Sequence, residues 1–240
     1  LNKKLYLNSN PDFSRYYDEK LDNLKRFDGL LAISQSSSSE LISFLEYDSS
    51  KVFNISSACD KKIFNTKSSK NNFSNKFDQY KPFLLYVGAG DPRKNLEGLI
   101  DAFSRLSVDL KNLKLVLAGK LLEPEIKLID DWVEIFNIDP ERVIKIGYVS
   151  DNDLVFLYKR CSLFVFPSFH EGFGLPVLEA MSCGAAVIGS NCTSIPEVIG
   201  WSDAMFDPYD VNSIKCLIEK SILNQEFNKE LVENSIKQSE

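Results

Sequence analysis

The sequence predicts an α/β fold: a Rossmann-like, doubly wound parallel sheet preceded by part of a second α/β domain. From Lys81 onward, short apolar runs such as FLLYV and KLVLA alternate with amphipathic stretches such as NLEGLIDAFSRL. Runs of four to six apolar residues bounded by Gly, Pro or Ser are typical of parallel strands that are buried on both faces. Strands that alternate with helices in this way form a parallel sheet with helices on both sides.

Helix-capping residues set the expected boundaries within residues 81–240. Asp151 begins one helix, Ser194 with Pro196 begins another, and Gly184 follows a third, at the position where a helix-ending glycine belongs. Together with the apolar periodicity, these signals place strands at 83–88, 114–119, 142–149, 163–168 and 185–190, and helices at 95–106, 125–138, 151–161, 174–184, 194–200 and 210–222.

Residues 1–80 differ in composition from the rest of the chain. Helix-like and strand-like segments alternate only twice before residue 57, which is too little for a complete doubly wound domain. We therefore expect residues 1–65 to be the C-terminal remnant of an N-terminal domain, and Leu1 to lie inside a longer protein. Residues 66–80 are rich in Asn and Ser, and Phe73 and Phe77 are the large apolar side chains that they could bury. This composition predicts a linker. The second domain then covers residues 81–240.

Composition excludes several classes of protein. The 240 residues include 28 Lys and Arg against 34 Asp and Glu. The net charge of −6 gives no indication of the excess positive charge that nucleic-acid binding requires. Five cysteines stand far apart without a Cys-x-x-Cys pair, which favours free thiols in a reducing, cytoplasmic compartment. The longest apolar runs fall well short of the roughly 20 residues that cross a bilayer. The one histidine, His170, provides no cluster for a metal.

A glycine turn follows the first strand of the second domain. Gly88-Ala89-Gly90 opens like a dinucleotide-binding fingerprint, but Arg93 stands where the third glycine belongs, and Lys94 follows it. Two cations beside the free amides of a helix N-terminus suit a phosphate or pyrophosphate. A solvated basic pair in a loop is an equally good interpretation of this segment alone.

The most informative stretch runs from Ser168 to Gly184. Its glycines allow a tight turn close to a ligand, and a proline fits the first helical turn, so the amides of Gly174 and Leu175 are expected to face the crevice above the strand ends. Two carboxylates, Glu171 in the loop and Glu179 in the helix, suit the paired hydroxyls of a sugar ring and a ribose. Apolar neighbours indicate that Glu179 is buried, and a buried carboxylate requires partners.

Two further features keep more than one interpretation open. His170 lies next to Glu171, but no serine or cysteine stands in a recognisable nucleophile turn, so we expect a structural or substrate-edge role for it. Thr193 and Ser194 precede another predicted helix. Their hydroxyls either face the same crevice or form an ordinary N-cap.

These segments together resemble a known family. FPSFHEGFGLPVLEAM at 166–181 contains the spacing E-x7-E, and with PRKN at 92–95 and SIPEVIG at 194–200 it resembles the retaining family 4, or group 1, glycosyltransferases of the GT-B fold. The resemblance covers roughly residues 81–223. In detail the chain is most similar to bacterial enzymes that add mannose or related sugars to O-antigen. The resemblance implies that residues 81–240 are the C-terminal, nucleotide-sugar donor domain and that residues 1–65 belong to the N-terminal, acceptor domain.

The resemblance also implies residue roles. Arg93 and Lys94 would neutralise the donor diphosphate and Glu171 would contact the hydroxyls of the donor sugar, which makes these three the expected catalytic residues. The others would bind the nucleotide. They are Glu179 at the ribose, the amides of Gly174 and Leu175 at the distal phosphate, Gly147 and Tyr148 beside the base, and Gly88. Neither a cofactor nor a metal is implied beyond the GDP- or UDP-linked donor. The leaving phosphate would itself accept the proton of the acceptor hydroxyl.

The sequence departs from the family pattern in two respects. Many members have an arginine after the first-strand glycine, where this chain has Ala89, so diphosphate binding would depend on Arg93 and Lys94. The family's N-terminal domain supplies the acceptor site, for a saccharide or lipid-linked acceptor, and any association with the inner face of the bacterial inner membrane. Two such domains need about 350 to 400 residues. This chain alone is therefore expected to bind the donor without transferring the sugar.

Alternatives of other classes remain at this point. The chain resembles a donor-binding domain, and a non-catalytic sugar-nucleotide-binding module or scaffold would carry the same features. Another GT-B enzyme, such as a nucleotide-sugar epimerase or a glycogen-synthase-like polymerase, is a second alternative. A dehydrogenase is the weakest, because the third glycine is absent and no acidic residue ends the strand KLVLAG.

Overall fold

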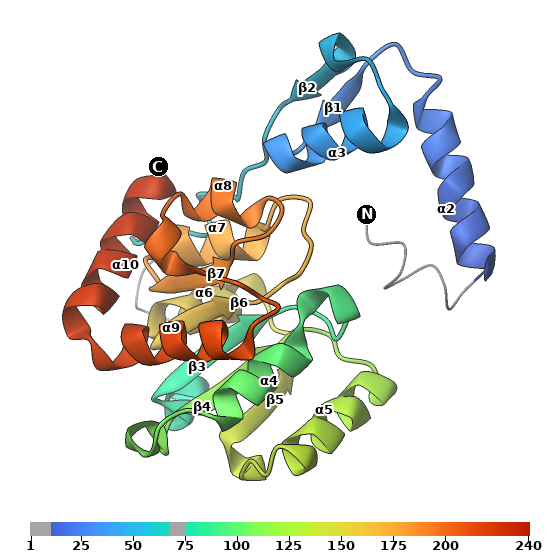
Figure 1. Cartoon of the computed structure of the whole chain (residues 1–240). Helices are drawn as coiled ribbons and strands as arrows, with labels where there is room; N and C mark the ends of the chain where they lie inside the picture. The colour runs from blue at the N-terminus through green and yellow to red at the C-terminus, as the bar shows by residue number, and fades with distance from the viewer. Residues whose placement is uncertain (1–10, 68–74) are drawn as a thin grey trace.

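The computed structural model describes residues 11–67 and 75–240, and a six-stranded parallel sheet forms its main body (Figure 1). The chain runs outward from the central strand β3 to β4 and β5, returns to β6 on the other side of β3, and continues outward to β8. This order confirms the doubly wound prediction. Across the sheet the strands are β5 (Val143–Gly147), β4 (Lys114–Ala118), β3 (Phe83–Val87), β6 (Leu163–Phe166), β7 (Val187–Ser190) and β8 (Met205–Phe206).

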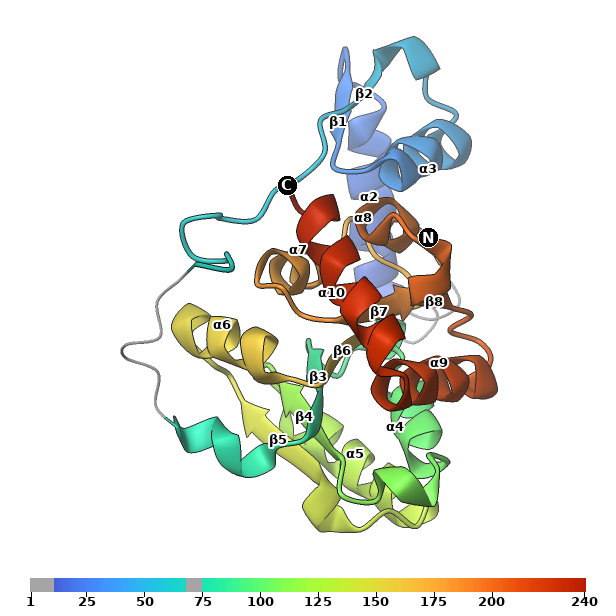
Figure 2. The same ribbon diagram turned by 90° about the vertical axis from the view of Figure 1, so that its left-hand side faces the viewer.

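Helices cover both faces of this sheet, as continuous apolar strands require. Figure 2 shows α6 on one side of the strands and α4 and α9 on the other. None of the helices among the described residues is long and apolar enough to cross a membrane. The helices that follow the strands are α4 (Leu96–Ser104), α5 (Glu123–Ile135), α6 (Asp151–Arg160), α7 (Leu175–Ser182), α8 (Ile195–Ile199), α9 (Val211–Leu223) and α10 (Gln225–Gln238).

A smaller unit precedes the sheet. It contains α2 (Pro11–Leu24), β1 (Leu30–Ala32), α3 (Gln35–Leu45) and β2 (Val52–Asn54), and its two strands pair in parallel. The side chain of Ser34 caps α3 by accepting a hydrogen bond from the amide of Ser37. Their order confirms that helix and strand alternate twice before residue 57. Figure 1 shows α3 as the part of this unit nearest to α8.

Three features differ from the sequence-based expectation. The predicted linker contains a 3-10 helix, Asn75–Tyr80, and Phe77 is buried against the ring of Phe156 at 5.9 Å between centroids. Phe64 is also buried in the core around the sheet, whereas Phe73 lies outside the described residues. Neither β8 nor α10 was predicted. The division of the chain at residues 65 and 80 stays a prediction.

Asn95 joins three loops at the carboxyl edge of the sheet. Its backbone is left-handed, with φ of 54°, and its side chain is buried. The side-chain amide donates to the carbonyl oxygen of Pro167, at 3.2 Å, and to that of Pro208, at 2.8 Å. Asparagine tolerates this conformation better than most residues, so one side chain ties the loop after β3 to the loops after β6 and β8.

We expect Asn95→Ala to destabilise the protein by about 2–4 kcal/mol more than Asn137→Ala. Asn137 provides the matched control because it has the same left-handed backbone, with φ of 52°, and is exposed, with no side-chain hydrogen bond to any described residue. Both variants incur the backbone strain, and only Asn95→Ala leaves buried carbonyls without their donor. Chemical denaturation of the two variants measures the difference. Equal losses would show that the side-chain bonds of Asn95 contribute nothing.

Candidate functional site

The candidate site lies where the winding of the sheet reverses, between β3 and β6. In open α/β sheets the carboxyl ends of the strands form a ligand crevice at this point. Lys94 is the last residue of a 3-10 helix, Pro92–Lys94, after β3, and Glu171 lies in the loop after β6. Lys94 Nζ is 2.7 Å from Glu171 Oε1, with the side chains only 18% and 12% exposed. The structure thus brings together two predicted site residues from opposite sides of the switch.

The ring of Phe166 supports this ion pair. Lys94 Nζ lies 5.4 Å from the centroid of the ring, within the range of a cation–π contact. A largely desolvated cation and carboxylate require each other, because removing one leaves an unpaired buried charge. The pair therefore fixes the direction of both side chains into the crevice.

Arg93 is oriented differently from Lys94. Its guanidinium makes a bidentate contact with the carboxylate of Asp91, with Nη2 2.9 Å from Oδ2 and Nε 3.2 Å from Oδ1. Its backbone carbonyl accepts a hydrogen bond from the amide of Phe169, at 2.8 Å, which joins the loops after β3 and β6 a second time. Asp91 therefore offsets part of the positive charge that the sequence assigned to Arg93.

Tyr86 fixes the glycine turn from below and was not singled out by the sequence. Its hydroxyl donates to the carbonyl oxygen of Ala89 at 2.8 Å. Burial, reinforced by the nearby carboxylate of Glu171, raises the pKa of Tyr86, so the phenol stays protonated and remains a donor. The only available signal was its place as the penultimate residue of a buried strand, just before the Gly88 turn.

The segment after β7 holds the Glu171 loop by its backbone. The hydroxyl of Thr193 accepts a hydrogen bond from the amide of Glu171 at 3.0 Å. Ser194, fully buried, directs its hydroxyl at two carbonyl oxygens, 3.1 Å from that of Glu171 and 2.9 Å from that of Phe173. Neither hydroxyl forms a side-chain cap on α8, so the expectation of an ordinary N-cap was wrong. They position the carboxylate instead.

Helix α7 begins in the way the sequence predicts. Gly174 is its N-cap, with φ of 104°, and a Cβ there would lie 2.6 Å from Ile195 Cδ1, so only glycine fits. The amides of Gly174 and Leu175 precede the first intrahelical hydrogen bond. Leu175 is 39% exposed, whereas Gly174 is buried, so solvent reaches the positive end of the helix at Leu175.

Glu179 has a partner that sequence reasoning missed. The hydroxyl of Tyr158 on α6 donates to Glu179 Oε2 at 3.0 Å. Burial raises the pKa of Glu179, although the hydrogen bond from Tyr158 opposes the shift. The carboxylate has a partner, as expected, but it is half-buried and not buried, which corrects the sequence-based expectation. Tyr158 gave no signal in the sequence, because it looks like any core residue of an amphipathic helix.

Three glycines form the far edge of the site. Gly119 has φ of 139°, and a Cβ there would lie 2.1 Å from the carbonyl oxygen of Gly88, so the turns after β3 and β4 approach closely only with glycine. The amide of Gly119 donates to the carbonyl oxygen of Gly147 at 2.8 Å. Gly147 itself faces open space, and the neighbouring Tyr148 is 80% exposed. A flat ligand could therefore reach the backbone here.

A cavity of about 460 Å³ adjoins the crevice on the α4 side. Its lining is aromatic and acidic, with Phe169 stacked on Tyr209 at 4.7 Å and with Asp91 and Asp101 on the wall. Both carboxylates are ion-paired, Asp91 with Arg93 and Asp101 with Arg105. Within the described ranges, no group of three or more His, Cys, Asp or Glu is arranged to hold a metal ion.

Fold and site together define a class of protein. A doubly wound sheet with a buried lysine at its switch point, a glycine edge and an open helix N-terminus is suited to a phosphorylated ligand such as a nucleotide. Residues 67–238 match the family model described as glycosyl transferases group 1. The chain belongs to this family, as its resemblance implied.

Individual relatives agree with the family assignment. The chain is 42% identical over its whole length to the serotype-specific mannosyltransferase WbdA of Escherichia coli, and 36% identical over 85% of its length to O-antigen chain mannosyltransferase B of the same species. It spans 30% and 53%, respectively, of the lengths of these relatives. The crystal structure of Anabaena Alr3699/HepE in complex with UDP and glucose matches 92% of this chain and 61% of its own, with a TM-score of 0.80 and 19% identity, which supports the fold.

We expect Glu179→Gln to stabilise the protein at neutral pH. The pKa of Glu179 is raised in the folded state, so its ionisation costs stability as pH rises through that pKa, and the cost disappears below about pH 4, where the carboxyl is protonated in both states. The gain should be about 1 kcal/mol or less, or a few degrees in Tm. Thermal melts from pH 4 to 8 measure it. Glu134→Gln, at an exposed position, is the control, and a pH-independent gain would contradict burial of the charged carboxylate as the cause.

Proposed function

We propose that this chain binds a nucleotide-diphosphate hexose, most simply a GDP- or UDP-linked mannose, as the donor-binding part of a retaining glycosyltransferase of cell-surface polysaccharide synthesis. The observation that carries the proposal is the ion pair of Lys94 and Glu171, both largely shielded from solvent, at the switch point. The pair supplies one group suited to phosphate and one suited to sugar hydroxyls, side by side. The names of the relatives, which describe mannosyltransferases of O-antigen chains, favour mannose as the sugar.

The ion pair gives a simple account of donor binding. A diphosphate entering the crevice offers Lys94 a second anionic partner, and Glu171 is then free to accept hydrogen bonds from the sugar hydroxyls. Arg93 adds its charge from the same 3-10 helix, moderated by Asp91. The amides of Gly174 and Leu175 donate to the distal phosphate at the positive end of α7.

The remaining predicted residues bind the nucleoside. Glu179 accepts hydrogen bonds from the ribose hydroxyls through the oxygen that Tyr158 leaves available. The backbone at Gly147 and the exposed Tyr148 flank the base, with Gly88 at the turn between base and diphosphate. No metal or cofactor is part of the proposal.

The chemical step follows from where charge develops. The bond between the anomeric carbon and the diphosphate oxygen breaks, and a bond from that carbon to the acceptor oxygen forms on the same face of the sugar. The acceptor proton passes to the departing phosphate oxygen. Negative charge grows on the diphosphate, and Lys94, Arg93 and the α7 amides stabilise it. We propose that the acceptor is a saccharide or lipid-linked acceptor at the inner face of the bacterial inner membrane. The free cysteines of the chain fit the reducing cytoplasm on that side of the membrane.

Titration calorimetry with GDP, UDP and GDP-mannose tests the proposal. We expect one of the nucleotides to bind, and Lys94→Ala or Glu179→Ala to weaken it by about tenfold or more, because each removes a direct polar contact. Lys94→Gln, which retains a hydrogen-bond donor, is included because removal of the lysine leaves Glu171 unpaired.

Matched controls separate the site from the surface. Lys127→Ala and Glu134→Ala make the same chemical changes at exposed positions of α5 and should leave binding unchanged. Thermal melts establish that each variant is folded. Binding of neither nucleotide, or equal affinity in the site variants and the controls, would overturn the proposed site.

A further inference from the structure

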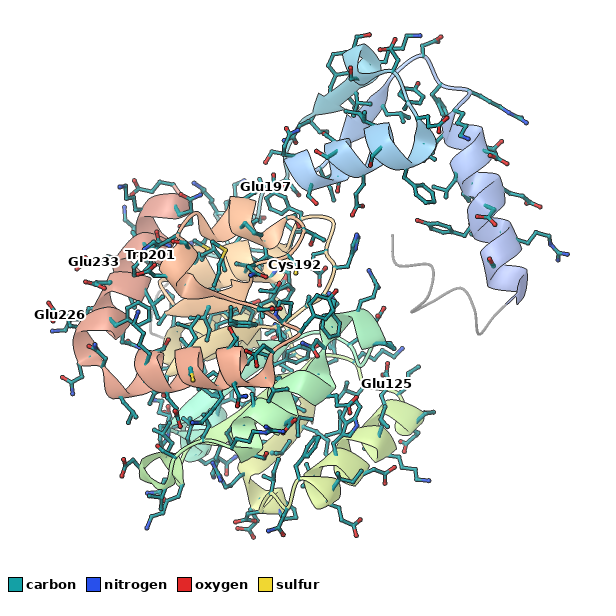
Figure 3. All side chains as sticks on the ribbon, viewed as in Figure 1. Glu125, Cys192, Glu197, Trp201, Glu226 and Glu233 are labelled. Atoms are coloured by element: carbon teal, nitrogen blue, oxygen red, sulfur yellow. The ribbon has the colours of Figure 1, made fainter. Side chains whose placement is uncertain are left out.

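Glu197 joins the two α/β units by capping a helix of the other unit. It lies in α8, within the SIPEVIG segment, and its carboxylate accepts two hydrogen bonds from the start of α3 (Figure 3). Glu197 Oε2 is 2.7 Å from the amide nitrogen of Gln35, and Oε1 is 2.7 Å from that of Ser36. The contact spans more than 160 residues of sequence.

The chemistry of the contact is specific. The first amides of a helix have no intrahelical partner, and the N-cap Ser34 serves only the amide of Ser37. The first turn of α3 contains no acidic residue of its own. A carboxylate that accepts from the remaining amides also interacts favourably with the positive end of the helix. Glu197, on α8, thus supplies the carboxylate that the first turn of α3 lacks.

The same end of α3 contacts the loop that carries Glu171. Ser37 Oγ donates to the carbonyl oxygen of Gly172 at 3.0 Å. Nε2 of His170 lies 2.6 Å from Oε1 of Glu40, and hydrogen bonding to this histidine lowers the pKa of Glu40. The residues on both sides of Glu171 are therefore held by α3.

The two sets of contacts meet in a single short segment. Ser194 holds the carbonyls of Glu171 and Phe173, and three residues later Glu197 holds α3. Residues 194–197 therefore hold the loop that carries Glu171 directly. They also hold α3, which packs on the other side of the same loop. Ile33, two residues before α3, also lies close to this loop, because its Cδ1 would be 3.3 Å from a Cβ added at Gly172.

We propose that Glu197 is a positioning residue for the donor sugar: by capping α3 it holds that helix against residues 170–172 and so maintains the placement of Glu171. This inference rests on the proposed function. It gives the carboxylate of the SIPEVIG segment a role at the sugar end of the site, without contact to the donor. Glu179, at the nucleotide end, is held instead by the hydroxyl of Tyr158 on α6.

The test compares Glu197→Gln with Glu233→Gln in the whole chain. Gln places an amide donor against the α3 amides, whereas Glu233 is exposed on α10, away from α3 (Figure 3). We expect the affinity advantage of GDP-mannose over GDP (or of UDP-glucose over UDP, if the chain prefers uridine) to fall by about tenfold in Glu197→Gln, the equivalent of one hydrogen bond to the sugar. Affinity for the nucleotide alone should stay within about twofold. A general loss of stability would weaken both ligands together, and that result, or an unchanged advantage, overturns the proposal.

Hydrogen–deuterium exchange provides a readout that needs no ligand. Glu197→Gln should raise exchange in residues 35–40 and also in residues 170–172, while Glu233→Gln leaves both unchanged. Faster exchange in α3 alone would show that the cap does not influence residues 170–172, and would overturn the inference. If the wild-type chain binds no nucleotide, the proposed function fails and the donor role of Glu197 fails with it, and exchange at 170–172 still reports whether Glu197 holds the loop.

Discussion

Parallel pairing of β3 with β6 is the constraint on which the site depends. The pairing aligns Leu84 with Leu163 and Leu85 with Phe164, and all four side chains are completely buried. Because helices cover both faces of these strands, the packing of individual side chains, and not an alternation of apolar and polar residues, fixes their alignment. That alignment sets the loops after the two strands side by side. Lys94 and Glu171 can then form an ion pair although 77 residues separate them.

The site combines charges that are satisfied in different ways. Lys94 and Glu171 neutralise each other, Arg93 is paired with Asp91, and Glu179 has a single phenolic donor. Burial disfavours the charged form of Glu179, which is a cost to folding that a bound polyhydroxyl ligand would offset. By contrast, side-chain hydroxyl groups form hydrogen bonds with the backbone at and after Glu171. Rigid backbone with charges that can exchange partners is an arrangement suited to binding a charged ligand without moving the loop.

The fold was largely predictable from the sequence, and the elements that the prediction missed have local causes. Each predicted strand from residue 83 to 190 is present, because a run of buried apolar residues is a signal that needs no knowledge of distant contacts. α10 was missed because it is mostly polar, with Phe227 and Leu231 buried one turn apart as its main apolar contacts. The 3-10 helix at residues 75–80 was missed because its stretch is polar and Phe77 is the one aromatic residue in it that is buried.

The sequence by itself determined which residue types stand at the ends of which strands, since strand periodicity and glycine spacing are properties of neighbouring residues. On that basis it predicted Lys94, Glu171, Glu179 and Gly174 as site residues. Only the tertiary structure decided their partners: Glu171 for Lys94, Tyr158 for Glu179, and the α3 amides for Glu197. Hydrogen bonds depend on distances of a few tenths of an ångström between elements that are far apart in the chain, and no local pattern in the sequence encodes those distances.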